Sequence, residues 1–147
     1  EIQMKKISIL AIAVALLLCL TGCPTQMSDV SWGGPAVGDI IGDMNGDGMV
    51  LTETGVPGEY QTASFKYANT MNAWGGGSGT INCKVRKEAG EWNGDYGVGT
   101  TPTIGGDFAK LSGGGNIVIT GFEADSNYHF VVKSTKENGV EMKVVKG

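Results

Sequence analysis

Apolar side chains in much of this chain recur at every second position, which is the spacing of a β-strand with one buried face. The clearest case is residues 81–86, which read Ile-Asn-Cys-Lys-Val-Arg. One face of this strand is apolar, and the other is polar and cationic. Ala89-Gly90 then breaks the strand, and the turn is expected to bring Trp92 and Tyr96 close together.

Similar short runs, bounded by Gly, Asn, Asp and Ser, predict the other strands. They cover residues 37–42, 60–67, 107–111, 116–120, 127–135 and 140–145. The connections Ser112–Gly115 and Lys136–Gly139 predict two hairpins, each joining the runs on either side. The last run places Val140, Met142 and Val144 on one side.

Composition agrees with an all-β fold, since Gly makes up 25 of the 147 residues and helical spacing is absent after residue 22. About seven to eight short, mostly antiparallel strands predict a single β-sandwich of the immunoglobulin-like or carbohydrate-binding-module-like kind. We expect this domain to occupy residues 37–147, after a signal peptide over residues 1–22 and a polar tether over residues 23–36.

The first segment has the features of a bacterial lipoprotein signal. Lys5-Lys6 precedes the apolar run Ile7–Leu20, which is too short for a stable membrane span. The run ends in Leu20-Thr21-Gly22-Cys23, which resembles a lipobox and implies lipid on Cys23. Each buried CH₂ of that lipid contributes about 0.8 kcal/mol, so multiple acylation would anchor the protein in the bacterial cell envelope. The alternative is an ordinary secretory signal with a chance cysteine.

Charge and cysteine content narrow the function classes. Loss of residues 1–22 removes two of the 11 basic and one of the 15 acidic side chains, which leaves a net negative domain and disfavours nucleic acid. Cys19 leaves with the signal and Cys23 carries lipid, so Cys83 has no disulfide partner. We expect Cys83 to be a small buried apolar residue and not a nucleophile paired with His129.

Aromatic and polar side chains around the turn predict a sugar site, because pyranose rings offer an apolar C–H face and hydroxyl groups. Indole or phenol rings would stack on glucose-like rings, and cationic or amide groups would bind hydroxyls. The candidate glycan-binding residues are Trp92, Trp74, Lys84, Tyr96, Arg86 and Asn93. One alternative is that Trp92 plugs a small core. Another is a structural or protein-interaction lipoprotein, partnered by other envelope proteins through exposed strand edges.

An ordered set of short signatures is similar to one domain of the SusE and SusF type of outer-membrane starch-binding lipoproteins. The signatures are Gly38–Asp43, Pro57–Tyr60, Cys83–Val85, Trp92, Tyr96–Gly97 and Gly114–Ile117. The resemblance implies a surface lipoprotein that binds an α-glucan such as starch, with Trp74, Lys84 and Trp92 matched by their place in the order of strands. Two departures are that Cys83 and Val85 replace aromatic residues, and that one domain stands where the family has several.

A second candidate site is the D-x-N-x-D-G run over residues 43–48, which resembles the first half of a calcium loop. Asp43, Asn45 and Asp47 would be the Ca²⁺ ligands. The twelfth position is Thr54, so the usual bidentate carboxylate is missing there. The alternative is a tight turn without metal, because Asn-Gly and Asp-Gly are common hairpin dipeptides.

The sequence gives no support for catalysis. Glu88, Glu91 and Asp95 lie near Trp92, but surface carboxylates beside a turn are usually only solvated. The sequence contains no nucleophile elbow, zinc-ligand cluster or P-loop. We therefore expect a non-catalytic protein and not a glycosidase.

Overall fold

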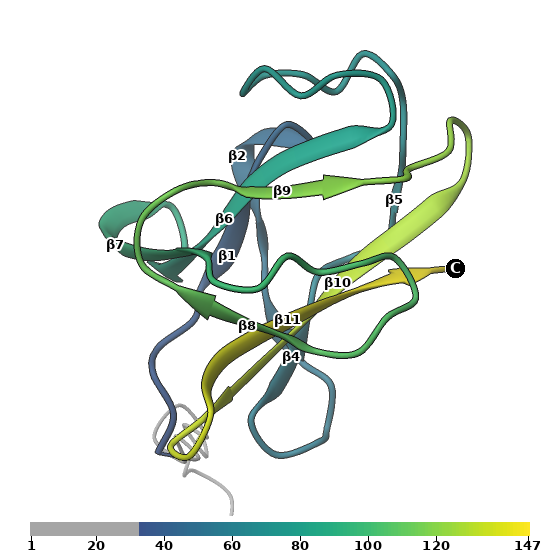
Figure 1. Cartoon of the computed structure of the whole chain (residues 1–147). Coiled ribbons are helices and arrows are strands. Elements are labelled where there is room, and N and C mark those ends of the chain that lie inside the picture. The colour runs from purple at the N-terminus through teal and green to yellow at the C-terminus, as the bar shows by residue number, and fades with distance from the viewer. Residues whose placement is uncertain (1–32) are drawn as a thin grey trace, which may run out of the picture. The chain divides into compact units, whose positions relative to one another are not determined.

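The computed structural model describes residues 33–147, apart from the side chains of Asn45 and Asp47. The predicted signal peptide, Cys23 and most of the predicted tether lie outside this range. Within it the chain forms eleven β-strands (Figure 1). They are β1 Asp39–Gly42, β2 Asn45–Val50, β3 Thr52–Glu53, β4 Glu59–Gln61, β5 Phe65–Lys66, β6 Thr80–Glu88, β7 Glu91–Val98, β8 Ala109–Ser112, β9 Ile117–Thr120, β10 Asn127–Thr135 and β11 Gly139–Lys146. No helix among the described residues is suited to crossing a membrane.

The strands form one antiparallel sheet in the order β2-β1-β6-β7-β8-β11-β10-β4-β3, with β9 paired to β6 and β5 to β10. The strands at the two ends of this order, β2 and β3, are separated in the chain only by Leu51. The sheet therefore curls back on itself and is nearly closed. The all-β class is confirmed, whereas a single sandwich of seven or eight strands is not, because the sheet is barrel-like.

Of the two predicted hairpins, only the C-terminal one forms. β11 pairs with β10 over its full length, from Tyr128 opposite Lys146 to Thr135 opposite Gly139. The hairpin expected around Ser112–Gly115 is wrong, because β8 pairs with β7 and β11 while β9 pairs with β6. The Gly115 carbonyl instead accepts a hydrogen bond from the Val98 amide at 3.0 Å. This Gly-rich segment therefore lies beside the end of β7.

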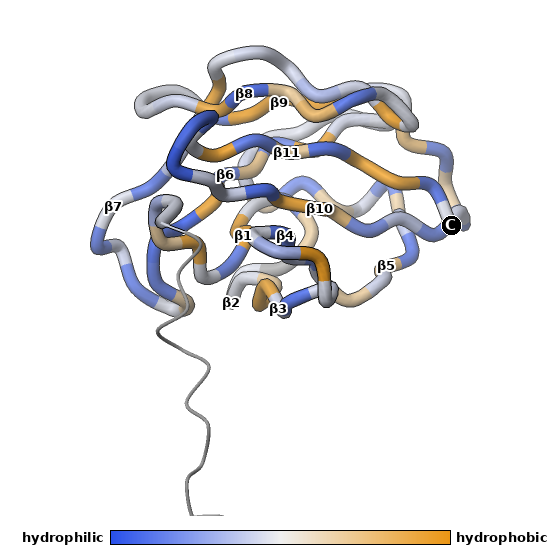
Figure 2. Tube along the Cα trace, turned by 90° about the horizontal axis from the view of Figure 1, so that it is seen from below, coloured by the Kyte–Doolittle hydropathy of each residue, from blue (hydrophilic) through white to orange (hydrophobic). Residues whose placement is uncertain are grey.

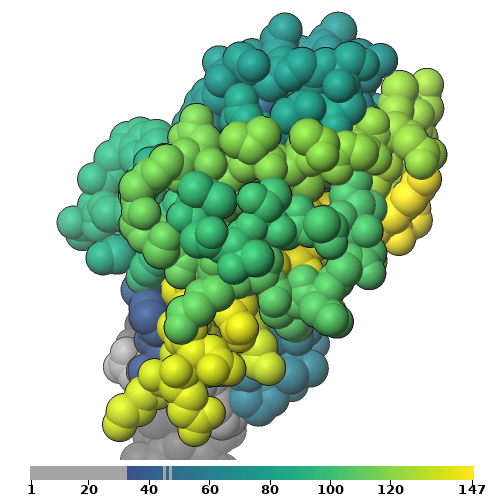
Figure 3. Space-filling view, in the orientation of Figure 1, coloured from purple at the N-terminus to yellow at the C-terminus, as the bar shows by residue number. Residues whose placement is uncertain are grey.

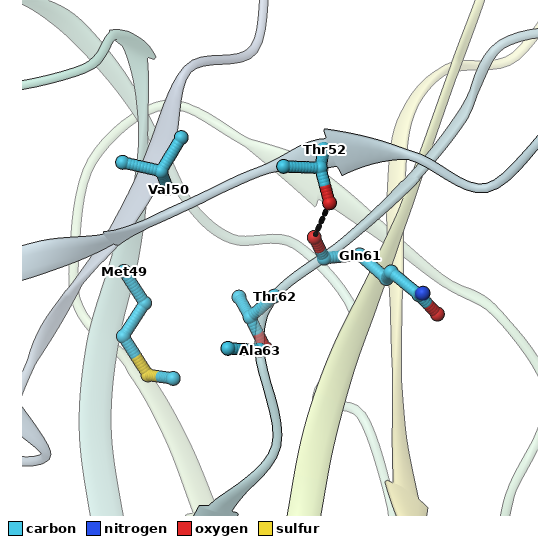
Figure 4. A pocket seen from close by; sticks show the side chains of 6 residues that line it. All are labelled: Met49, Val50, Thr52, Gln61, Thr62 and Ala63. Carbon is cyan, nitrogen blue, oxygen red and sulfur yellow. Dashed lines mark hydrogen bonds between the residues drawn. The ribbon is translucent and has the colours of Figure 1, made fainter.

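The predicted strand over residues 60–67 is interrupted. The β3–β4 pairing ends where Thr52 lies opposite Gln61, and the two chains then separate. A hollow of about 440 Å³ opens there, lined by Met49, Val50, Thr52, Gln61, Thr62 and Ala63. Figure 4 shows Met49 and Val50 on one side of it and Thr62 and Ala63 on the other, with the Thr52–Gln61 hydrogen bond at its end. The hollow is where the closure of the sheet is incomplete.

The core is formed by the apolar side chains that alternate with polar ones along the strands. Figure 2 shows this alternation as orange and blue segments along β10 and β11. Val140, Met142 and Val144 all point into the core, as their spacing predicts. Cys83 is fully buried among them, and burial raises the pKa of its thiol. Its role as a small buried apolar residue is thus confirmed.

Gly97 allows β7 to approach the Gly-rich segment after β8. A Cβ at this position would lie 2.1 Å from the carbonyl oxygen of Gly115, a backbone atom that cannot turn aside as a flexible side chain can. We expect Gly97→Ala to lower the free energy of unfolding by about 1–3 kcal/mol, as overpacking does. Urea denaturation measures this.

The matched control is Gly113→Ala, because a Cβ at Gly113 meets no atom within 4 Å. This variant should be neutral or slightly stabilised by its less flexible unfolded chain. Equal unfolding midpoints for the two variants would contradict the close approach at Gly97.

Candidate functional site

The outer face of β1 and β6 carries the polar residues from which the candidate site is built. Asp39 lies opposite Arg86, and Ile41 lies opposite Lys84. The residues between them in each strand, such as Ile40, point into the core. Side chains alternate across a strand, so the predicted polar and cationic face of residues 81–86 points outward.

Arg86 is bound to Asp39 in a buried ion pair, with the two residues 3% and 1% exposed. Its Nε donates to Asp39 Oδ1 at 2.7 Å, and its Nη2 donates to Oδ2. This hydrogen bonding to Asp39 raises the pKa of the guanidinium. The amide of Gly90, in the β6–β7 turn, also donates to Asp39 Oδ2 at 3.0 Å. Arg86, predicted as a donor to sugar hydroxyls, therefore has a structural partner already.

Trp92 lies on the surface and is 60% exposed. Its ring is stacked on that of Trp74, with centroids 6.0 Å apart and planes inclined by 22°. The guanidinium carbon of Arg86 lies 5.3 Å from the Trp92 ring centroid, within cation–π range. Trp92 as a core plug is therefore wrong. Trp74 and Trp92, with Arg86 against them, are called the aromatic platform below.

A bulge in β7 brings Trp92 to this face. Arg86 pairs with Asp95 and Glu88 pairs with Glu91, so β7 uses two more residues than β6 between these pairs. Gly94 lies inside the bulge at φ +103°, a conformation that favours glycine. The β6–β7 hairpin projects at the left of Figure 3 as a teal lobe.

Trp74 belongs to the long loop before β6, and the carboxylate of Asp43 binds this loop. Trp74 N donates to Asp43 Oδ1 at 2.6 Å, Gly76 N donates to the same oxygen at 3.3 Å, and Asn82 N donates to Oδ2 at 2.6 Å. Asn82 Nδ2 also donates to the Trp74 carbonyl at 3.2 Å. Asp43 itself is only 4% exposed, so its charge is satisfied by these backbone groups.

The predicted calcium loop has a different local structure from the one its motif suggests. The β1–β2 turn falls at Asp43 and Met44, and β2 begins at Asn45. The side chains of Asn45 and Asp47 lie outside the described part of the structure. Among the side chains that are described, no group of three or more His, Cys, Asp or Glu residues could hold a metal ion. A cation at Asp43 would compete with the backbone N–H donors, and the calcium site stays a prediction.

Lys84 forms an ion pair with Asp95, with Nζ 2.8 Å from Oδ2. Both side chains are partly buried on the outer face, where Asp95 also lies opposite Arg86 in the strand register. The sequence pattern pointed to Lys84, whereas Asp95 looked like an ordinary surface carboxylate. The missing information was the β6–β7 register, which no local pattern supplies.

The remaining two candidates, Tyr96 and Asn93, make other contacts. Tyr96 is opposite Val85 and packs against the core, so burial raises the pKa of its hydroxyl. Its ring contacts the ammonium of Lys87 at 5.6 Å. Asn93 is exposed, and its Nδ2 lies 3.5 Å from Glu88 Oε2. The structure thus groups Trp74, Trp92 and Arg86 and places Tyr96 toward the interior.

No protein-family model matches this chain, and no curated protein or solved structure matches it either. Function has to be inferred from the side chains and their contacts.

Proposed function

We propose that this protein is a non-catalytic lipoprotein of the cell envelope that binds a glycan, an α-glucan such as starch, through the aromatic platform. The observation that carries the proposal is the 60% exposure of Trp92. A large apolar side chain in water forgoes the gain of about 25 cal/mol per Å² that burial would give. An exposed ring fixed in place against neighbouring groups is suited to stacking on the C–H face of a sugar.

The surroundings of Trp92 favour a preorganised site. Its contacts with Trp74 and Arg86 restrict the indole before any ligand arrives, so less side-chain entropy is lost on binding. The Lys84–Asp95 pair, on the same outer face beside Arg86, offers a hydrogen-bond donor and an acceptor. Sugar hydroxyls require both. These groups differ from the predicted set by the addition of Asp95 and by the omission of Tyr96 and Asn93.

The test is retention of the soluble domain, residues 24–147, on insoluble starch and on other polysaccharides, combined with tryptophan fluorescence titration. We expect maltoheptaose to change the emission of the protein, because Trp92 would pass from water to a sugar face. Retention on another polysaccharide alone would change the glycan assignment. Failure to bind any of the polysaccharides or oligosaccharides would contradict the proposed function.

Lipid attachment is the second part of the proposal and rests on the lipobox. We expect Cys23→Ser to abolish acylation and to move the protein from the membrane fraction to the soluble fraction. Cys19→Ser is the matched control, because Cys19 is expected to leave with the signal peptide. Metabolic labelling with a fatty acid and fractionation measure both variants. A Cys23→Ser protein that is labelled and fractionates like the wild type would exclude the anchor.

An alternative proposal is a structural or protein-interaction lipoprotein. It is favoured by Val50, which is 59% exposed on β2 and lines the hollow on the side opposite Ala63. An open strand edge can pair with an extended segment of another protein. Absence of glycan binding, together with saturable capture of a purified envelope protein, would favour this alternative over the glycan site.

A further inference from the structure

Two buried aspartates stand at the two ends of β1. Asp43 binds the loop that carries Trp74, and Asp39 binds the turn that leads to Trp92. Asp39 is the first residue of β1, and Asp43 directly follows its last residue. The sequence predicts a calcium ligand at Asp43 and assigns no role in the sugar site to either aspartate. We propose that Asp39 and Asp43 are positioning residues that set the relative placement of Trp74 and Trp92. The role in binding rests on the proposed glycan function.

Asp43 acts on Trp74. The main-chain N–H of Trp74 itself donates to the carboxylate at 2.6 Å, and Gly76, two residues on, donates to the same oxygen. The other oxygen accepts from Asn82 N on β6. One buried carboxylate thus joins the tryptophan-bearing loop to the strand over which the platform lies. Hydrogen bonds to a charged group are stronger than neutral ones, so these bonds restrict the backbone of Trp74.

Asp39 acts on Trp92 in the corresponding way. It accepts a hydrogen bond from Gly90 N, two residues before Trp92. It also binds the guanidinium of Arg86, which contacts the Trp92 ring. The turn that leads to Trp92 and the side chain that contacts its ring are therefore bound to the same carboxylate.

The spacing of the two aspartates limits the distance between the points at which the two tryptophan-bearing segments are attached. They are four residues apart, one at the start of β1 and the other in the turn that follows it, so their Cα atoms are at most about 13 Å apart. The two tryptophans approach each other from these two attachments until their ring centroids are 6.0 Å apart. β1 is paired on both sides, to β2 and β6, and is therefore a rigid base for the two attachments. A substitution beneath the platform should thus alter binding without touching the sugar.

Asp43→Asn is the first variant to test. The amide retains one acceptor oxygen but turns an NH₂ donor toward backbone N–H groups, so it cannot replace the carboxylate. We expect loss of the far-ultraviolet circular dichroism couplet that two stacked indoles produce, and glycan affinity about tenfold lower, equivalent to about 1.4 kcal/mol. Asp107→Asn, which changes an exposed carboxylate, is the matched control and should keep both signals.

A double-mutant cycle separates positioning from a general structural effect. If Asp43 acts through Trp74, Asp43→Asn should lower affinity in the wild-type background and have little further effect in a Trp74→Ala background. An equal loss of affinity in both backgrounds would overturn the proposal.

Gly76→Ala provides a second variant in case Asp43→Asn fails to fold. A Cβ at Gly76 would lie 2.2 Å from Asp43 Oδ2, the oxygen that accepts from Asn82 N, so the loop and the carboxylate cannot keep their present contact. Loss of the couplet in this variant supports the proposal, and an unchanged couplet overturns it. The couplet needs no ligand, so it tests the positioning even if the wild-type protein binds no glycan, a result that would remove only the proposed function.

Discussion

Trp92→Ala should bind maltoheptaose about tenfold to hundredfold more weakly than the wild type while unfolding at a similar urea concentration. Stacking of a planar ligand on a protein aromatic contributes about 1–3 kcal/mol, and a sugar face on indole should be of the same order. The free energy of unfolding should change little, because Trp92 is 60% exposed and contributes little buried area. Fluorescence or calorimetric titration measures the affinity, and a urea melt measures the stability.

Two variants serve as controls for this result. Trp92→Phe keeps a flat ring and should recover part of the affinity. Val56→Ala removes apolar surface from another exposed side chain, in the β3–β4 turn, and should leave affinity unchanged. If Trp92→Ala instead lost about 3–5 kcal/mol of stability with its affinity intact, Trp92 would be a packing residue.

Arg86→Leu should lower the free energy of unfolding by about 3–5 kcal/mol. The variant leaves the carboxylate of Asp39 in a site that is 1% exposed, without the guanidinium that binds both of its oxygens. An uncompensated buried charge is costly, whereas the pair itself adds little beyond an apolar pair of similar size. Urea denaturation of the purified domain measures the loss.

The loss of stability should therefore depend on whether a buried charge remains without its partner. Asp39→Leu combined with Arg86→Leu should recover a large share of the stability, because no buried charge is left. Lys146→Met is the control for an exposed pair, since Lys146 bonds Glu123 on the surface, and it should change stability little. If Arg86→Leu were as stable as Lys146→Met, the ion pair would not be sealed from water as the structure shows.

Period-two alternation predicted the strands well where one face is buried. It located β6 and the β10–β11 hairpin, because the inward-facing positions of these strands are apolar. They are Ile81, Cys83 and Val85 in β6, and Val140 and Met142 in β11. It could not show which strands are neighbours. Ser112–Gly115 has hairpin composition, yet β8 and β9 have different partners, since register and pairing depend on contacts distant in sequence.

The aromatic platform was predicted only in part, for a related reason. Trp74, Trp92 and Arg86 were singled out by residue type, and they do lie together. The bulge at Gly94 separates Trp92 from Tyr96, which no local pattern indicated. Asp43 has the spacing of a calcium ligand in sequence, but its hydrogen bonds to the Trp74 loop exist only after distant segments meet. The resemblance to SusE and SusF proteins stays a prediction.

The single residue between β2 and β3 has a consequence for how the chain folds. β3 pairs with β4, and β4 pairs with β10, whereas β2 pairs with β1 at the opposite end of the sheet. The N-terminal strands therefore cannot be enclosed until the C-terminal hairpin is available. Such non-local closure predicts slow folding. During synthesis the edge of β2, which includes Val50, would stay unpaired until the later strands are made. An intermediate with that edge exposed would be the species most prone to pair with another copy of itself.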